Sequence, residues 1–217
     1  MWWDIAPAVR GDFEHWHSHE HFPERLSIPG FLRASRWSSA NGGEGFFVLY
    51  ELEGHEVLSS PPYLAHLNAP TPWSQRLMPE HRNMVRTQCR VLESQGAAIA
   101  RQVLTVRLSP ASGRDAELRS ALRALAADVA QRPGLAGLHL LRHEPPAMAA
   151  TQEQKIRGLR DAGADWVLVA SGYDPEALSA LASAQLGEVA LERMGAASGS
   201  VQGLYSLSAT ATPADTR

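Results

Sequence analysis

The chain of 217 residues is poor in several residue types, and each shortage excludes a class of protein. Cys89 is the only cysteine, so neither an intrachain disulfide nor a cysteine metal cluster can form. It lies in the alternating apolar run MVRTQCRVL, which predicts a buried, unreactive thiol. No apolar run approaches the roughly 18 residues of a membrane-spanning helix, and no basic segment followed by an apolar one opens the chain. We therefore expect a cytoplasmic protein with no membrane partner.

An excess of positive charge is also missing. The chain has 20 Lys and Arg against 23 Asp and Glu, which gives a net charge of −3. Lys155 is the only lysine, and the arginines are dispersed among acids. This balance predicts no nucleic-acid partner. An apolar share of 44% supplies ordinary core material for one larger domain or two small ones.

What the chain has instead is a cluster of histidines in the segment FEHWHSHEHFPERL. The four alternate along it, at His15, His17, His19 and His21. The unperturbed pKa of histidine lies near neutrality, so such a cluster suggests acid/base or metal chemistry. Asp12 follows Gly11 as a plausible N-cap, which predicts a helix from Asp12 to about Leu26.

The predicted elements follow a similar order in the two halves of the chain. In the first half we expect strands at 2–7, 31–37, 45–52 and 83–93, with helices at 12–26, 56–67 and 73–79. In the second we expect strands at 100–110, 135–144, 163–173 and 203–213, with helices at 113–134 and 175–187. Both halves reduce to β-α-β-β-α-β, the ferredoxin-like order.

The predicted fold class is therefore α+β, with two tandem ferredoxin-like units whose sheets pack as a dimeric α/β-barrel within one chain. Residues 1–97 form the unit with the pocket, because most histidines and tryptophans precede residue 100. Residues 98–217 form a mainly structural unit with a helical insertion near 145–164. An exposed sheet edge or helix face of the second unit could support a homodimer.

The first half resembles a known superfamily. Its recurrent pattern is a tryptophan, an acidic-histidine-x-proline step on the first helix, and a PGF entry to the second strand. The matching residues are Trp16, Glu20, His21, Pro23, Pro29, Gly30 and Phe31. On this pattern residues 1–95 resemble the dimeric α/β-barrel superfamily, and within it EthD-like proteins. The resemblance implies the fold and a pocket. Cofactor-independent monooxygenases, lactone isomerases, decarboxylases and haem enzymes share that superfamily, so the reaction needs a separate argument.

Helical spacing divides the histidines into two faces. His17 and His21 are four residues apart and share one face, whereas His15 and His19 are expected on the other, solvated face. Pro23 cannot donate to the carbonyl of His19, so the helix should kink or end beside His21.

His21 is therefore the candidate general base, oriented by Glu20 or Glu24 and assisted by His17. The alternative is that His21 only hydrogen-bonds a neighbouring backbone group and caps the kinked helix. His17 and His21 also have the spacing of helical zinc ligands, but HExxH is absent and no third ligand has a characteristic spacing. We predict no metal and no cofactor. Folding could bring His66 or His81 near the pair, but the sequence does not show whether it does.

Several side chains could bind a substrate. Arg25 or Arg33 could pair with a carboxylate or enolate, or form salt bridges to Glu20 or Glu24. Aromatic side chains could wall a cavity or simply pack in the core. The predicted substrate-binding set is Trp16, Arg25, Trp37, Tyr50, Tyr63 and Trp73.

The preferred function is a cofactor-independent enzyme on a small aromatic, polyketide-like or carboxylated metabolite. Proton transfer by histidine would drive isomerisation, decarboxylation or oxygenation. One alternative is a non-catalytic carrier of a small molecule, and another is a haem-binding barrel with a histidine axial ligand. An enzyme needs polar groups that converge on its ligand, whereas a carrier pocket can be apolar throughout.

Overall fold

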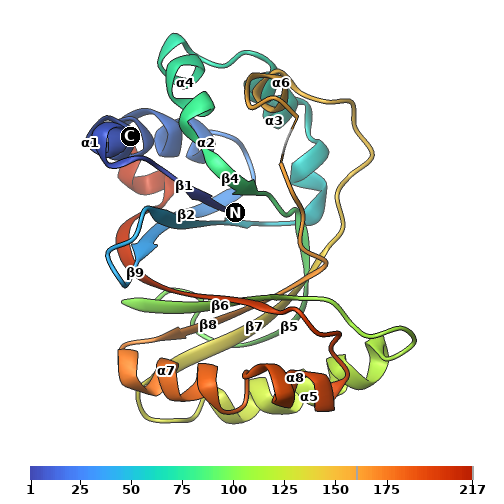
Figure 1. Cartoon of the computed structure of the whole chain (residues 1–217). Coiled ribbons are helices and arrows are strands. Elements are labelled where there is room, and N and C mark those ends of the chain that lie inside the picture. Colours follow the sequence, from blue (N-terminus) through green and yellow to red (C-terminus); the bar gives the residue numbers. More distant parts are fainter. Residues whose placement is uncertain (160, 217) are drawn as a thin grey trace. The chain divides into compact units, whose positions relative to one another are not determined.

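A computed structural model describes residues 1–159 and 161–216, which divide into two compact units (Figure 1). The first unit consists of Met1–Gln88, Pro145–Gly163 and Ser208–Arg217, and the second of Cys89–Glu144 and Ala164–Leu207. Each unit has an antiparallel sheet with helices, so the predicted α+β class and the two ferredoxin-like units are confirmed.

The first unit has the ferredoxin-like strand order β4-β1-β3-β2. Its strands are β1 (Trp2–Asp4), β2 (Phe31–Ser39), β3 (Gly45–Leu52) and β4 (Arg82–Val85). Its helices are α1 (Pro7–Trp16), α2 (Phe22–Leu26), α3 (Pro61–Asn68), α4 (Pro72–Leu77) and α6 (Gln152–Ile156). These helices cover one face of this sheet (Figure 1). Short 3₁₀ turns at His55–Ser59 and Met78–Glu80 precede α3 and follow α4.

Strand alternation divides the aromatic residues of this sheet between its faces. Phe46 and Val48 point into the core under the helices, where Phe13 packs on Phe46 with ring centroids 4.9 Å apart. Phe47 points to the opposite face and packs on Trp37 at 5.3 Å. Each fully buried large side chain stabilises the fold by about 1.5–3 kcal/mol. Phe13 and Phe46 therefore belong to the hydrophobic core of the unit that holds the site.

The second unit has the strand order β9-β6-β8-β7-β5. Its strands are β5 (Cys89–Gly96), β6 (Gln102–Leu108), β7 (Leu135–His143), β8 (Trp166–Gly172) and the first seven residues of β9 (Val201–Ala211). Its helices are α5 (Asp115–Val129), α7 (Pro175–Ser183) and α8 (Glu188–Met194). The elements β6-α5-β7-β8-α7-β9 repeat the ferredoxin-like order, with α8 as an addition that the sequence did not predict.

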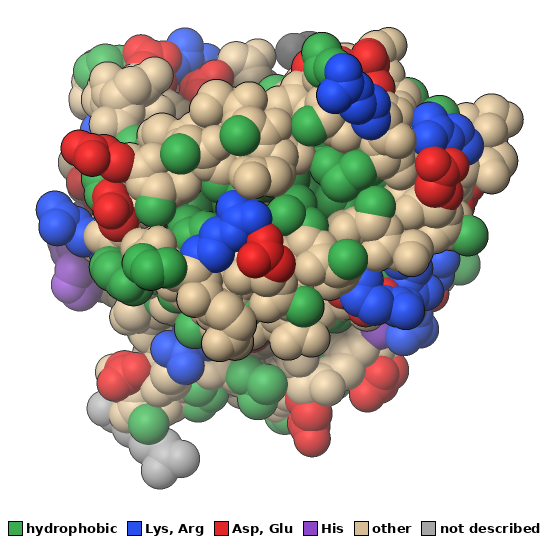
Figure 2. Space-filling view, turned by 90° about the horizontal axis from the view of Figure 1, so that it is seen from below, with side chains coloured by type: hydrophobic (Ala, Val, Ile, Leu, Met, Phe, Trp, Pro, Cys, Tyr) green, Lys and Arg blue, Asp and Glu red, His purple; other side chains and the backbone are tan. Residues whose placement is uncertain are grey.

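The helix α5 shows why periodicity predicted this unit well. Its residues Leu118, Leu122, Ala126 and Val129 recur at helical spacing and are all fully buried. Charged residues occupy its outer side, and Figure 2 shows charged and apolar side chains interspersed over the outer face of the helices in this unit.

The unit boundaries differ from the predicted division at residues 97 and 98. The predicted strand 83–93 is two strands: β4 pairs with β1 in the first unit, and β5 pairs with β7 in the second. The predicted insertion near 145–164 belongs to the first unit, where Ala162 bridges Val85 of β4. The end of β9 also joins the first unit, since Ser208 donates to the carbonyl of Arg36 at 3.0 Å.

Two local expectations are wrong. The first helix begins at Pro7 rather than Asp12, because proline at the first helical position is pre-set for the helix and Gly11 is tolerated inside it. Cys89 is half-buried at the start of β5 rather than buried, since an edge strand leaves one side open. In the part of the chain that the structure describes, no helix is long and apolar enough to cross a membrane.

Candidate functional site

A π-helical turn at His17–His21 joins α1 to α2 and positions the histidines. The N–H of Phe22 donates to the carbonyl of His17, five residues earlier. Pro23 has no N–H and its ring crowds the preceding carbonyls, so the chain widens by one residue here. The wide turn brings the rings of His17 and His21 to 5.3 Å.

The predicted division of the histidines into two faces is what the structure has. His17 and His21 are buried, whereas His15 and His19 are exposed and lie against each other at 4.6 Å. Phe22 and Leu26, which the simple helical wheel groups with the exposed pair, are buried in the core, because the π turn rotates α2 relative to α1.

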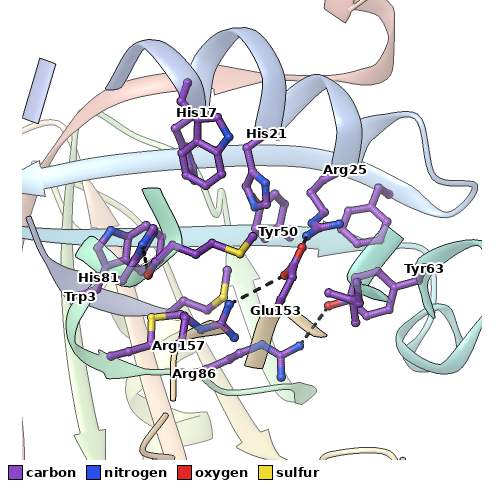
Figure 3. A pocket seen from close by; sticks show the side chains of 16 residues that line it. Trp3, His17, His21, Arg25, Tyr50, Tyr63, His81, Arg86, Glu153 and Arg157 are labelled. Atoms are coloured by element: carbon purple, nitrogen blue, oxygen red, sulfur yellow. Dashed lines mark hydrogen bonds and ion pairs between the residues drawn. The ribbon is translucent and has the colours of Figure 1, made fainter. Parts of the chain in front are cut away.

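A cavity of about 60 Å³ lies beside the buried histidines, wholly within the first unit (Figure 3). Its lining combines aromatic rings with basic and acidic groups: Trp3, Trp16, His17, His21, Arg25, Phe31, Tyr50, Tyr63, His81, Arg86, Glu153 and Arg157, with Met1, Leu67, Met78 and Met84. Five buried atoms of lining residues have no hydrogen-bond partner among the described residues: Trp3 Nε1, His17 Nδ1, His21 Nδ1, Arg25 Nη1 and the Tyr50 hydroxyl. Those of His21 and Arg25 lie within ion-pair distance of Glu24, whereas the other three have no ion pair in the described residues. Such atoms are rare in folded proteins unless water or a ligand meets them.

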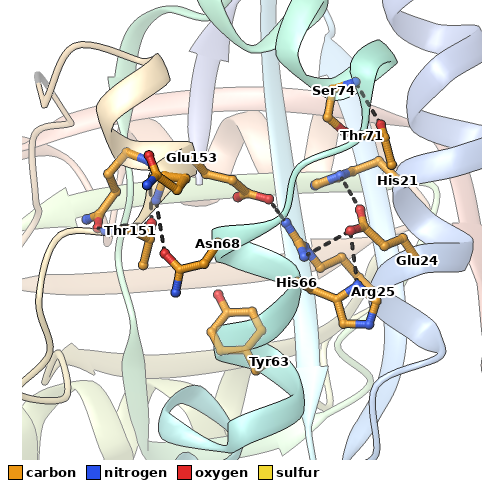
Figure 4. A network of polar contacts seen from close by, with 12 residues as sticks. His21, Glu24, Arg25, Tyr63, His66, Asn68, Thr71, Ser74, Thr151 and Glu153 are labelled. Atoms are coloured by element: carbon orange, nitrogen blue, oxygen red, sulfur yellow. Dashed lines mark hydrogen bonds and ion pairs between the residues drawn. The ribbon is translucent and has the colours of Figure 1, made fainter.

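His21 and Glu24 form the central polar pair. Nδ1 of His21 lies 3.4 Å from Oε2 of Glu24 (Figure 4). The His21 ring stacks on Trp16 with ring centroids 4.6 Å apart. Burial and then Arg25 lower the pKa of His21, although Glu24 opposes them. The ring is therefore neutral at pH 7, with Nδ1 facing the carboxylate and Nε2 left to accept a proton.

Glu24 stays ionised to very low pH. Burial alone would raise its pKa, but the contacts with His21, Arg25 and His66 outweigh burial and hold the pKa at about 2. His66 Nδ1 lies 3.1 Å from the other carboxylate oxygen. Glu24 is thus a permanent negative charge behind the His21 ring.

His17 and His81 are the other two imidazoles of the cavity, and both are held neutral. Burial, with the neighbouring His21, lowers the pKa of His17 well below its usual value. Burial and the charge of Arg157 lower the pKa of His81 to about 3. Nδ1 of His81 lies 3.1 Å from the carbonyls of Leu77 and Met78, so it carries the proton and Nε2 is bare.

Glu153 of α6 faces the cavity from a distant part of the sequence. It forms a buried ion pair with Arg25 and a longer one, at 3.9 Å, with Arg157 (Figures 3 and 4). Arg157 also pairs with Asp161 at 2.7 Å. Burial alone would lower the pKa of Arg25, but Glu153 and Glu24 reverse this and raise it. Two of the three cavity arginines are therefore neutralised within the protein.

The structure brings together most, but not all, of the residues predicted for the site. The cavity lining includes His17, His21, Trp16, Arg25, Tyr50 and Tyr63. The lining does not include three of the predicted residues, Glu20, Trp37 and Trp73. The carboxylate of Glu20 accepts from Trp16 Nε1 at 3.0 Å and from Thr71 Oγ1 at 2.5 Å, which ties the π turn to the start of α4.

The two remaining tryptophans have other contacts. Trp37 is fully buried against Phe47 on the opposite face of the sheet. Trp73 donates to Asp12 at 3.2 Å and lies against His15 on the exposed side of α1. Arg33 is also outside the cavity, where it pairs with Glu51 at 3.3 Å.

Sequence reasoning missed four polar residues of the cavity: His81, Arg86, Glu153 and Arg157. None belongs to a local motif, because each reaches the cavity only through the fold. The one available signal was a charged pair at helical spacing in the 145–164 segment, Glu153 and Arg157. Among the described residues, no group of three or more His, Cys, Asp or Glu side chains is arranged to hold a metal ion.

Three solved structures have a similar fold. The first is an anthrone oxidase-like protein, 16% identical with a TM-score of 0.64, matched over 100% of this chain and 92% of that one. The second is a candidate monooxygenase from Fusobacterium nucleatum, 8% identical with a TM-score of 0.60, over 97% and 91%. The third is a candidate monooxygenase from Lactobacillus acidophilus, 11% identical with a TM-score of 0.58, over 98% and 93%.

The likeness covers nearly the whole of each chain, so this chain shares its fold with these three proteins. No protein-family model matches the sequence. No curated protein matches it either.

Proposed function

We propose that the chain is an enzyme that removes a proton from a small metabolite, with His21 as the general base. The observation that carries the proposal is the His21–Glu24 pair at the cavity. A neutral imidazole accepts the proton on Nε2, and the fixed carboxylate at Nδ1 stabilises the imidazolium that forms. The structural neighbours are an oxidase-like protein and two candidate monooxygenases. Their names favour molecular oxygen as the second substrate of this enzyme, which would react with the carbanion that proton removal leaves.

Tyr50 supplies the complementary group for the negative charge that develops on the substrate. Its hydroxyl is buried and has no hydrogen-bond partner among the described residues. Burial raises the pKa of Tyr50, so the hydroxyl keeps its proton and can donate it to an enolate or phenolate oxygen. A base and a donor on one cavity are the minimum for enolisation.

The size of the cavity limits the substrate. Its volume of about 60 Å³ is well below the roughly 300–1,000 Å³ of sites for drug-sized ligands. A tricyclic compound such as an anthrone would enter only if lining side chains part. We therefore favour a substrate of monocyclic size or smaller over the polyketide-like one.

A non-catalytic carrier is less well supported. A carrier can bind its ligand with an apolar wall, whereas here neutral imidazoles, a tyrosine hydroxyl and arginines converge on one small cavity. Burying polar groups costs stability unless they are hydrogen-bonded or paired, and an apolar carrier pocket would avoid that cost.

The first experiment measures proton transfer directly. Enolisable and phenolic compounds of increasing size, from monocyclic ketones to anthrone, are incubated with the protein in D₂O, with and without oxygen. NMR follows deuterium uptake, and an electrode follows oxygen consumption. We expect His21→Gln to lower the rate of the proton step by about 100-fold or more.

The matched control is His19→Gln, on the exposed side of the same helix segment, which should keep the wild-type rate. Equal rates for wild type and His21→Gln on an exchanging compound would refute the assignment. So would equal losses in the two variants when circular dichroism shows both to be folded.

A further inference from the structure

Arg86 differs from the other two arginines of the cavity. It follows β4 directly, and its backbone N–H donates to the carbonyl of Ala162 at 2.8 Å, which fixes its position. Its guanidinium donates to the Tyr63 hydroxyl at 3.1 Å (Figure 3). It also donates to Gln88 Oε1 at 3.3 Å. Both acceptors are neutral.

The three arginines of the cavity differ in whether an acidic side chain pairs with them. Arg25 pairs with Glu153, and Arg157 pairs with Asp161 at 2.7 Å. Arg86 forms no ion pair with any Asp or Glu of the described residues. Among the residues that the structure describes, the half-buried cation Arg86 therefore has no acidic side chain within ion-pair distance.

We propose that the substrate carries a carboxylate and that Arg86 binds it. The inference rests on the proposed function only in taking this cavity as the substrate site. Of the five N–H groups of a guanidinium, the two contacts with Tyr63 and Gln88 use two, so a pair remains for a carboxylate. Tyr63 accepts from Arg86, so its own proton is available to the same carboxylate.

Orientation and size narrow the ligand further. Tyr63 and Arg86 lie on one side of the cavity, and His17 and the His21 ring on another (Figure 3). A carboxylate held at Arg86 directs the rest of the molecule toward the imidazoles and the Tyr50 hydroxyl. A cavity of about 60 Å³ holds roughly four or five water-sized groups. The substrate class is thus a small carboxylic acid with an acidic C–H or O–H group.

The test compares a probe acid with its neutral isostere. Pyruvate and pyruvamide have the same shape and differ in charge, so ligand-observed NMR titrations at constant ionic strength isolate the carboxylate. We expect wild type to bind pyruvate at least about tenfold more tightly than pyruvamide. Arg86→Gln should abolish that preference, and Tyr63→Phe should reduce it by a smaller factor.

Arg86→Lys keeps the charge without the planar fork, so it should retain part of the preference. Arg82→Gln is the matched control: it removes an exposed arginine of the same segment, which pairs with Glu44, and should bind like wild type. Equal affinity of wild type for the two probes, no binding of pyruvate, or an unchanged preference in folded Arg86→Gln would each overturn the proposal.

The binding preference for pyruvate over pyruvamide tests the carboxylate site separately from the role of His21 as general base. His21→Gln should bind pyruvate with the wild-type preference even though it loses proton transfer. If Arg86→Gln loses the preference while His21→Gln keeps full activity, the carboxylate site stands and the general base is wrong. If His21→Gln loses activity and the preference for pyruvate does not depend on Arg86, the general base stands and the carboxylate site is wrong.

Discussion

His17, His21 and His81 enter the folded state as neutral imidazoles, and burial, which lowers the pKa, is the main cause in each case. Secondary causes differ: His17 faces His21, His21 faces Arg25, and His81 faces Arg157. A base must be unprotonated before it can act, and burial with these neighbours keeps the three imidazoles neutral below the ordinary pKa of histidine.

The same shifts predict how stability depends on pH. Each folded-state pKa lies below the unfolded value of about 6.5, so the unfolded chain binds more protons as the pH falls. The stabilisation is complete above pH 6.5 and is lost progressively toward the folded pKa, which for His81 is about 3. The free energy of unfolding should therefore fall from about pH 6.5 to about pH 4.5.

Urea unfolding at half-unit pH steps measures that slope. Each imidazole that titrates fully in the unfolded chain contributes about 1.4 kcal/mol per pH unit. His81→Gln should flatten the curve over this pH range by up to that amount. Glu24 affects stability only at lower pH. Its folded-state pKa of about 2 lies below its ordinary value, so its contribution is lost as the pH falls from that ordinary value toward 2. A curve with the same slope in wild type and His81→Gln would contradict the prediction.

At the scale of elements, two short pieces shape the cavity. The π turn between α1 and α2 aligns His17 with His21, and α6 places Glu153 opposite Arg25. The α6 helix has a capping box, in which Thr151 and Gln154 satisfy each other's backbone N–H groups. A five-residue helix needs such a cap, because it has few internal hydrogen bonds.

We predict that Glu153→Gln destabilises the first unit strongly. It leaves Arg25, which is only 3% exposed, beside a neutral amide. Removing one partner of a buried ion pair costs about 3–5 kcal/mol. Thermal and urea unfolding measure the loss. Glu117→Gln on α5 breaks an exposed pair with Arg114 and should cost less than about 1 kcal/mol. Similar losses in the two variants would show that the Glu153 pair is unimportant.

Sequence reasoning succeeded at this scale where information is local. Periodicity placed α5, and proline chemistry singled out the turn beside His21. It also offered Glu24 as the partner of His21, because the two are three residues apart on one helix. It could not choose Glu24 over Glu20, because that depends on the extra residue of the π turn.

At the scale of the whole molecule, the first unit is built from three separate stretches of the chain. The segment Pro145–Gly163 lies beside β4, and the end of β9 lies beside β2. Both stretches lie beyond the boundary at residue 97 that the sequence predicted. Association into a homodimer stays a prediction.

A fragment of residues 1–97 should therefore not form a native first unit. It lacks Glu153, the partner of the buried Arg25, and the stretch that bonds to the backbone of β2. We expect poor dispersion in its ¹H–¹⁵N NMR spectrum and no preference for pyruvate over pyruvamide. Full-length protein is the control. A well-dispersed fragment that binds pyruvate as the full chain does would contradict the unit boundaries described above.

The sequence by itself determined the α+β class, the ferredoxin-like order of elements and the buried histidine pair. These depend on hydrophobic periodicity, turn residues and the missing N–H of Pro23, which act over a few neighbouring residues. Only the tertiary structure decided which groups complete the cavity. His81, Arg86 and Glu153 are far from His21 in sequence, and their pairing depends on how strands and helices pack. Ion pairs and burial are set by distance in space, and no local pattern encodes that distance.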